Sequence, residues 1–65
     1  MRATAEERDE IMSQAACSVD ATARVLGIGR TQAYKAVKNG EIRSIRIGGR
    51  VLVPTAALRQ MLDLS

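Results

Sequence analysis

The sequence predicts a small α+β domain that is mostly helical, with one β-hairpin and a closing C-terminal helix. Three observations predict this fold class. Apolar residues recur at helical spacing in residues 18–26 and 30–38, and a glycine-bounded turn separates the two segments. The period then changes to two on either side of a Gly-Gly pair, which is typical of a hairpin. Pro54 opens a last segment in which apolar residues again have helical spacing.

Composition limits the chain to one thin core. Its 65 residues include ten alanines and only five each of valine, isoleucine and leucine, and Tyr34 is the sole aromatic residue. Such a core has no room for a cofactor pocket of about 300 Å³ or more. Without histidine and with one cysteine, neither nucleophile–histidine pairs nor the usual zinc ligand sets can form. We therefore expect no enzyme activity, no catalytic residue, no cofactor and no metal. Cys17 is interpreted as a small buried or half-buried hydrophobe.

Charge is distributed unevenly along the chain. Residues 1–20 carry two cationic and five acidic side chains, which gives a net charge of −3. Residues 21–65 carry eight cationic and two acidic side chains, which gives a net charge of +6. A basic body suggests a polyanionic partner. The sequence contains no apolar run long enough for a membrane span and no signal peptide. We therefore expect a soluble, cytoplasmic protein without a membrane partner.

Residues 1–17 form an acidic leader that we expect to be helical. Thr4 and Glu7 match a capping box, which predicts that a helix begins at Ala5. Ile11 and Met12 lie in a narrow apolar stripe on one side of this helix. The leader's acidic residues are interpreted as a solvated face. Three arrangements of the leader remain open: it could be a helix docked on the domain, a contact between copies of the chain, or a partly frayed segment.

The next two helices form a helix–turn–helix. Ser18 is the N-cap of the first, which Gly27 ends, and the second runs from Arg30 to Lys38. In the second helix a helical wheel places Ala33, Val37 and the ring of Tyr34 toward the core. Thr31, Gln32 and Lys35 point the opposite way, with Lys38 at the edge. The exposed face is polar, cationic and free of acid, so it offers groups for base edges and phosphates.

The hairpin has two possible registers. A two-residue Gly48-Gly49 turn pairs Ile47 with Arg50 and mixes the two faces. A three-residue loop over 48–50 pairs Ile47 with Val51 and places four β-branched residues on one face. Turn chemistry favours the first register and packing the second. We predict the second, in which Arg46 and Arg50 project from the outer face and the tip.

The closing helix begins at Pro54-Thr55 and covers the hairpin with an apolar side. That side contains Ala57, Leu58, Met61, Leu62 and Leu64. A helix–turn–helix followed by a basic glycine-tipped hairpin is the order of a winged helix-turn-helix, whose second helix enters a major groove about 12 Å wide. We predict that residues 18–65 form such a DNA-binding domain. On these grounds its candidate DNA contacts are Thr31, Gln32, Lys35, Lys38, Arg46 and Arg50.

Residues 18–62 resemble the excisionase-type winged helix-turn-helix family, which is related to the DNA-binding part of MerR regulators. The family commonly has serine at position 29 and proline at position 43, where this chain has Gly29 and Arg43, and the leader lies outside the shared motif. The motifs that carry the resemblance are Ser18-Val19, Leu26-Gly27-Ile28-Gly29-Arg30-Thr31, Ala33-Tyr34, Asn39-Gly40-Glu41-Ile42, Arg46-Ile47-Gly48-Gly49-Arg50 and Val53-Pro54, with Leu58 and Leu62 in the closing helix.

The resemblance implies a recombination directionality factor of a phage or an integrative element. Such proteins bind the arms of attachment sites, often as cooperative arrays, bend the DNA and help a tyrosine integrase to excise the element. Self-association would use the leader helix or the closing helix. The resemblance implies that Thr31, Gln32 and Lys35 meet base edges or nearby phosphates. It also assigns Arg30 and Tyr34 to the DNA backbone, and Arg46 and Arg50 to the wing contact. With these residues and Gly49 at the hairpin tip, the candidate DNA contacts number nine.

Two other functions remain open from the sequence. A small phage or mobile-element transcriptional regulator would use the same fold at a promoter instead of an attachment site. A protein-interaction module acting through the acidic leader would show no salt-dependent DNA binding.

Overall fold

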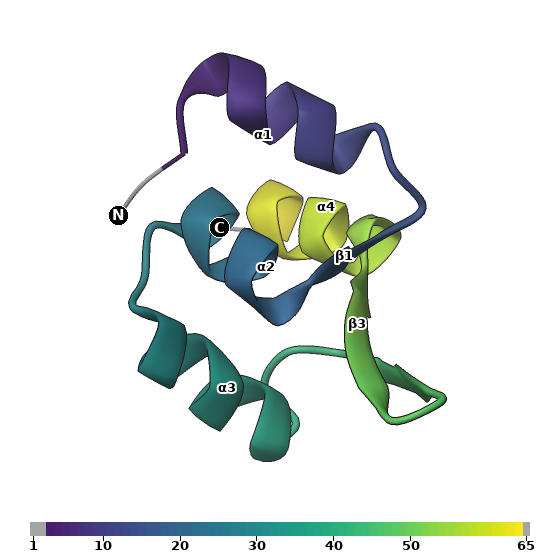
Figure 1. Ribbon diagram of the computed structural model, residues 1–65. Coiled ribbons are helices and arrows are strands. Elements are labelled where there is room, and N and C mark those ends of the chain that lie inside the picture. The colour runs from purple at the N-terminus through teal and green to yellow at the C-terminus, as the bar shows by residue number, and fades with distance from the viewer. Residues whose placement is uncertain (1–2, 65) are drawn as a thin grey trace.

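The computed structural model describes residues 3–64, and the side chains of residues 3–63. Helices α2 and α4 lie in the middle of the molecule, with α1 on one side and α3 and the hairpin on the other (Figure 1). This arrangement confirms the predicted fold class, a small and mostly helical winged helix-turn-helix with a hairpin wing and a closing helix. Its elements are α1 (Ala5–Met12), β1 (Ala16–Ser18), α2 (Val19–Leu26), α3 (Arg30–Lys38), β2 (Ile45–Ile47), β3 (Arg50–Pro54) and α4 (Thr55–Leu64).

Local capping interactions explain where the first two helices begin and end. Thr4 Oγ1 accepts a hydrogen bond from the Glu7 N–H at 3.1 Å, and a Glu7 carboxylate oxygen accepts one from the Thr4 N–H at 3.3 Å. This reciprocal pair is the predicted capping box. Ser18 Oγ caps α2 by accepting from the Ala21 N–H at 3.0 Å. Gly27 ends α2 in the left-handed region, with φ of 72°, where glycine carries no steric penalty.

Helix α3 begins without a side-chain cap. Its N-cap is Gly29, and the one local side-chain bond is from the Gly29 N–H to Gln32 Oε1 at 3.3 Å. Gly29 has φ of −70° and ψ of 154°, a conformation that serine adopts freely. A Cβ atom there would meet only Gln32 Oε1, at 3.8 Å, which is ordinary contact.

Gly29→Ser is therefore expected to stabilise the domain. A serine hydroxyl can cap α3, and the unfolded chain loses backbone freedom, which together contribute about 0.5–1 kcal/mol to the free energy of unfolding. Urea denaturation followed by circular dichroism measures the change. Gly27→Ser is the matched control and is expected to destabilise, because φ of 72° strains a serine. A lower urea midpoint for the Gly29→Ser protein would contradict this account of the cap.

The sheet has three antiparallel strands in the order β1–β3–β2. Strand β1 pairs with β3 through Cys17 opposite Val53 and Ser18 opposite Leu52. The sequence patterns do not predict β1, because three residues are too short to show an alternation. This strand also spans the proposed boundary between residues 17 and 18, and that division into domains stays a prediction.

The predicted hairpin register is wrong. The turn is the two-residue Gly48-Gly49 turn, so Ile47 pairs with Arg50 and Ile45 with Leu52. Both glycines have positive φ, 54° and 85°, as in a type I′ turn, whose twist matches that of the strands. Turn chemistry therefore prevails over burial of the isoleucines. The consequence is that the Ile45 and Ile47 residues are 44% and 59% exposed.

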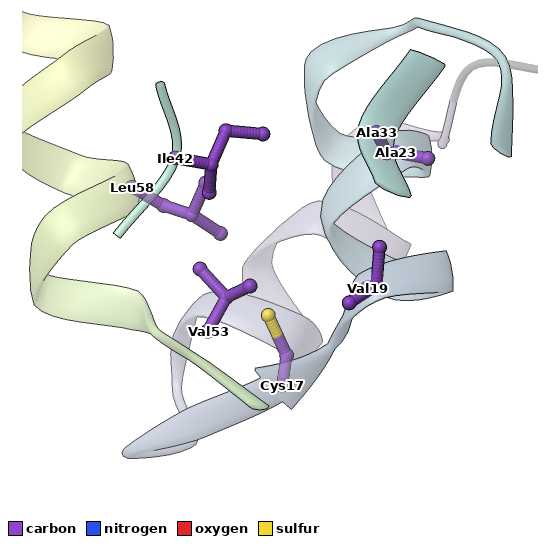
Figure 2. Close-up of a cluster of buried hydrophobic side chains, with 7 residues drawn as sticks. All are labelled: Cys17, Val19, Ala23, Ala33, Ile42, Val53 and Leu58. Atoms are coloured by element: carbon purple, nitrogen blue, oxygen red, sulfur yellow. The ribbon is translucent and has the colours of Figure 1, made fainter. Parts of the chain in front are cut away.

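A compact apolar cluster joins the sheet to three of the helices. Val53 of β3 and Leu58 of α4 are fully buried, and Cys17 is buried as predicted, with its Sγ 3.4 Å from Thr22 Oγ1. Figure 2 shows the side chains of the cluster, which are Cys17, Val19, Ala23, Ala33, Ile42, Val53 and Leu58.

Helix α1 is docked on the domain, which is one of the three arrangements left open for the leader. The Ala3 N–H donates to the Arg24 carbonyl of α2 at 2.9 Å. The Arg59 guanidinium of α4 donates to the Met12 carbonyl at 3.0 Å, and the Thr55 N–H donates to the Ala15 carbonyl at 3.1 Å. These bonds attach both ends of α1 to the helices of the core, on the side away from α3 (Figure 1).

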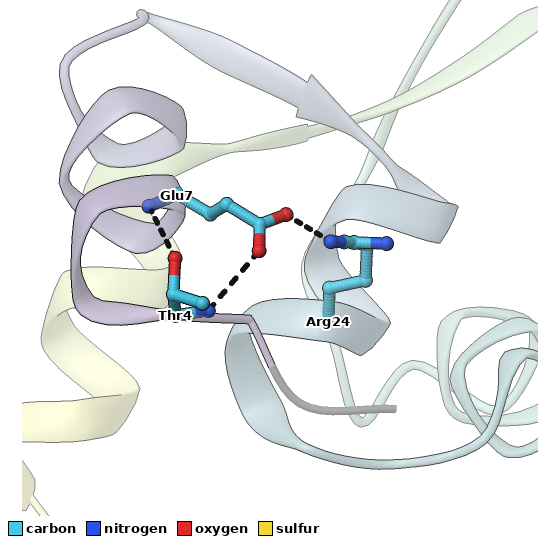
Figure 3. Close-up of polar contacts among 3 residues, drawn as sticks. All are labelled: Thr4, Glu7 and Arg24. Atoms are coloured by element: carbon cyan, nitrogen blue, oxygen red, sulfur yellow. Dashed lines mark hydrogen bonds and ion pairs between the residues drawn. The ribbon is translucent and has the colours of Figure 1, made fainter.

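An ion pair between Glu7 of α1 and Arg24 of α2 adds a pH-dependent contact (Figure 3). The hydrogen bond from the Thr4 N–H and the Arg24 guanidinium hold the pKa of Glu7 below its usual value of 4.5. A carboxyl whose pKa is lower in the folded state stabilises the fold above its unfolded pKa. That contribution is lost as the pH falls below about 4.5.

Glu7→Gln is expected to lower the urea midpoint at pH 6.5 and to have a smaller effect at pH 3. The glutamine retains the oxygen that accepts from Thr4, so the variant isolates the charge. Arg24→Gln removes the other partner and is expected to show the same pH dependence. Urea titrations of the three proteins across this pH range test it, and a difference that is the same at both pH values would argue against the ion pair.

Candidate nucleic-acid interface

The solvent-facing side of α3 carries most of the candidate residues. Thr31, Gln32 and Lys35 are exposed as the helical wheel predicts, and Ala33 is fully buried in the apolar cluster. Arg30 and Lys38 are exposed at the two ends of the helix. The structure thus brings six of the nine candidates, including Tyr34, onto one helix.

The Tyr34 side chain lies outside the core, contrary to the prediction from the wheel. The Tyr34 residue is 48% exposed. The core positions on this side are occupied instead by Ala33 of α3 and by Ile42, which follows the helix. Its ring instead lines a groove between α3 and the hairpin. The tyrosine is therefore part of the candidate interface with both its ring and its hydroxyl.

The groove between α3 and the hairpin joins the helix to the wing. It is lined by Tyr34, Val37 and Lys38 from α3, and by Ser44, Arg46 and Val51 from the hairpin side. Two cations and two hydroxyl groups thus surround one groove. Such groups bind phosphate oxygens.

The predicted position of Arg46 on the outer face of the hairpin is wrong. Arg46 pairs with Val51, and directly paired residues point to the same side of a sheet, so Arg46 faces the groove and α3. The physical reason is the two-residue turn, which moves every side chain of β2 to the opposite face from the one predicted.

The tip of the hairpin is slim and cationic. A Cβ atom added at Gly48 or Gly49 would meet no other atom within 4 Å, so the turn projects into open space. Arg50 follows directly and is exposed. Gly49, Arg50 and Tyr34 also line a common hollow, which brings the tip close to the middle of α3.

Two features of the surface are not evident from sequence. Arg30 at the start of α3 forms an ion pair with Asp20 of α2 at 2.8 Å, and both side chains are half exposed or more. An exposed pair of this kind contributes only about 0–1 kcal/mol, so Arg30 can exchange it for a phosphate. Ser44 joins the groove from a loop, where no periodic pattern could have predicted it.

Among the described residues, the remaining cations of the candidate set form no ion pair. Over the part of the chain that the structure describes, Lys35, Lys38, Arg46 and Arg50 have no carboxylate within salt-bridge distance. Within the same described residues, no group of three potential metal ligands occurs, and no helix is long and apolar enough to cross a membrane. The surface is thus a cationic face made of a helix and a hairpin.

A polar, cationic helix beside a slim basic wing defines the DNA-binding winged helix-turn-helix class. Residues 16–63 match the family described as "Helix-turn-helix domain", so the chain belongs to this helix-turn-helix family. It is 44% identical over 41 residues to a protein of Saccharopolyspora erythraea named "Probable excisionase". The predicted excisionase-type helix-turn-helix family is thereby confirmed.

The match to the Saccharopolyspora protein covers 63% of this chain and 42% of that relative, so it spans less than half of the relative's length. No solved structure matches the chain.

Proposed function

We propose that the protein is an excisionase. In this role it binds the attachment-site arms of a phage or integrative element and helps a tyrosine integrase to excise that element in the bacterial cytoplasm. The observation that carries the proposal is the cationic surface of α3 and the wing in a chain whose relative is named a probable excisionase. The protein itself makes and breaks no bond in this role. By the same resemblance we propose kinship with the DNA-binding part of MerR regulators.

In the proposed complex α3 enters the major groove. Thr31, Gln32 and Lys35 face the base edges, since they lie at the centre of the exposed side. Because Gln32 Oε1 already accepts from the Gly29 N–H, its amide NH₂ is the group left for a base. That group is a donor, so Gln32 is expected to favour an acceptor such as guanine O6 or N7.

The DNA backbone follows the groove between α3 and the hairpin. Lys38 and Arg46 supply positive charge on its two sides, and the Tyr34 and Ser44 hydroxyls supply hydrogen bonds to phosphate oxygens. Arg30 contacts the backbone at the other end of α3. Gly49 and Arg50 at the tip lie toward the adjacent minor groove, which is about 6 Å wide and whose negative potential attracts an arginine side chain.

Bending and cooperative binding complete the proposal. Bending a site of 20–30 base pairs by 40–90° costs on the order of 1–6 kcal/mol, which one small domain with few base contacts supplies poorly. Several copies on repeated sites would share this cost. We therefore propose that the protein self-associates along the DNA and bends it as an array.

Reconstituted excision tests the proposal. The purified chain is added to a tyrosine integrase encoded beside it and to a plasmid carrying the attachment sites, and circular product is measured. We expect excision to rise at least tenfold, with protection of the attachment-site arms in a footprint. Protection of a promoter alone, without any effect on excision, would instead identify a transcriptional regulator.

A further inference from the structure

One acidic side chain lies within the basic part of the chain, and the proposed DNA contacts do not use it. Residues 21–62 carry eight cationic side chains and a single acidic one, that of Glu41. Glu41 is exposed, and among the described residues its carboxylate has no ion pair and no hydrogen bond. The fold therefore gains no polar contact from this carboxylate. A negative charge near bound DNA is repelled by the phosphates, so it weakens binding unless it meets a suitable group.

The backbone holds Glu41 against the C-terminal end of α3. Gly40 has φ of 79°, which turns the chain back after the helix. The N–H groups of Glu41 and Ile42 then both donate to the Ala36 carbonyl, at 2.8 and 3.3 Å. The Ile42 side chain is buried in the apolar cluster. Glu41 is thus fixed by its own N–H group and by the residue that follows it, so its exposed carboxylate projects from an anchored backbone.

Glu41 lines a hollow beside α3, on the side away from the hairpin. This hollow shares no residue with the groove between α3 and the hairpin, and helical geometry places the two on opposite sides of α3. Gln32 and Lys35, which the proposed function assigns to base edges, line this hollow as well. The hollow is lined by Ile28, Gln32, Lys35, Ala36, Asn39 and Glu41. The carboxylate therefore lies at one border of the side of α3 that faces DNA in the proposed complex.

The hollow combines hydrogen-bond donors with one group that only accepts. The Lys35 ammonium is a donor, and the Gln32 amide NH₂ is the donor left free by the bond to the Gly29 N–H. Both groups suit the acceptors O6 and N7 of guanine. An ionised carboxylate accepts hydrogen bonds and cannot donate, so Glu41 suits an amino group.

Only two bases present an amino group in the major groove, cytosine at N4 and adenine at N6. Adenine places the acceptor N7 next to its amino group, and the lone pair of N7 repels a carboxylate. Cytosine presents N4 without a neighbouring acceptor. Guanine O6 and thymine O4 are themselves acceptors, so the carboxylate would be left desolvated without a partner. The base edge that fits Glu41 best is therefore that of cytosine.

We propose that Glu41 is a specificity-determining residue that accepts a hydrogen bond from the N4 amino group of a cytosine, beside the base contacts of Gln32 and Lys35. At other sequences the carboxylate meets acceptors or phosphates and lowers the affinity, so Glu41 acts mainly against wrong sites. The inference rests on the proposed function, since it adds one base to those that the α3 surface reads in the major groove.

Titration of the full chain against its footprinted site and against random DNA tests the discrimination. For Glu41→Ala, the ratio of the Kd on random DNA to the Kd on the site is expected to fall about tenfold, because the site loses a hydrogen bond and random DNA loses a repulsion. Glu41→Gln keeps the shape of the side chain and is also expected to lower the ratio, since its amide can donate to carbonyl oxygens.

Glu10→Ala is the matched control for the charge. Glu10 is exposed on α1, which lies on the opposite side of the molecule from α3 (Figure 1). The substitution removes the same carboxylate at a distance from the DNA, where salt screens its charge, so the ratio is expected to change by less than about twofold. Circular dichroism monitors the folding of each variant.

Removal of the amino group from the DNA identifies the base. Each cytosine of the footprinted site is replaced in turn by a pyrimidinone nucleotide that lacks the N4 amino group. At one cytosine the wild type is expected to lose about tenfold in affinity, and Glu41→Ala less than about twofold. A change in base pairing or DNA shape affects both proteins equally, so the comparison isolates the hydrogen bond.

Each contrary result has a distinct meaning. An unchanged ratio for Glu41→Ala would show that the carboxylate does not discriminate between sites. Equal losses by the wild type and Glu41→Ala at every replaced cytosine would show that no cytosine amino group binds Glu41. Either result would overturn the inference and leave the proposed function standing. Failure of the wild type to prefer attachment-site arms over random DNA would overturn the proposed function, and the inference with it.

Discussion

Replacing Lys35 and Arg50 together with glutamate is expected to abolish specific DNA binding while leaving the domain folded. Both side chains are exposed and neither forms an ion pair among the described residues, so the fold does not depend on their charge. Each reversal turns attraction toward phosphate into repulsion, which we expect to weaken binding roughly tenfold or more per site. The slope of the logarithm of the affinity against the logarithm of the salt concentration should also become shallower, by the amount that about two phosphate contacts contribute.

Fluorescence anisotropy at several salt concentrations measures the effect, with circular dichroism to monitor folding. Single variants provide a matched comparison, since Lys35→Glu and Arg8→Glu change the net charge equally, but Arg8 lies on α1, away from α3 (Figure 1). Arg8→Glu is expected to bind nearly as well as wild type. Unfolding of the Lys35→Glu protein, or equal losses in both variants, would refute the assigned surface.

Leu58→Ala is expected to destabilise the domain severely. Leu58 is fully buried between α4 and the sheet, and removing a buried leucine side chain costs about 2–5 kcal/mol. A chain of this length has a total stability of only about 3–10 kcal/mol. We therefore expect the Tm to fall by about 10 °C or more.

The matched control for this prediction is Leu62→Ala in the same helix. Leu62 is 38% exposed, so the same substitution removes much less buried surface and is expected to lower the Tm by only a few degrees. Thermal unfolding of the two variants, followed by circular dichroism, compares them directly. Equal shifts in Tm would contradict the position of the core between α4 and the sheet.

The helix boundaries could be predicted because their signals are local. Thr4 and Ser18 cap helices through bonds to residues three positions away, and Gly27 ends α2 with a left-handed conformation. These interactions depend on a few consecutive residues, which the sequence displays directly. The order of helix, turn and helix follows from them, whereas the hairpin and the closing helix are predicted by the period-two pattern around Gly48-Gly49 and by Pro54.

The strand pairing could not be predicted in full because it depends on distant parts of the chain. The buried Val53 pairs with Cys17 of β1, and nothing near residues 16–18 in the sequence indicates this partner. Once β1 and α4 cover Val53, the core has no need of Ile45 and Ile47. The glycine turn then determines the register.

The candidate site likewise has a part that local geometry predicts and a part that depends on distant residues. The exposed side of α3 follows from helical geometry, which is why Thr31, Gln32 and Lys35 were predicted to be exposed. The direction of Arg46 depends on the register of the hairpin, and the ion pair of Arg30 with Asp20 depends on how α2 meets α3. Both belong to tertiary structure, which a helical wheel does not contain.

The central claim is that α3 and the wing bind DNA, and a gel-shift titration tests it most directly. The full-length protein is titrated against DNA flanking its own gene at two salt concentrations, with random DNA as competitor. Discrete complexes that resist competitor and weaken with salt are the predicted result. Absence of any complex at low salt, with a folded protein verified by circular dichroism, would contradict the claim and favour a protein-interaction module instead.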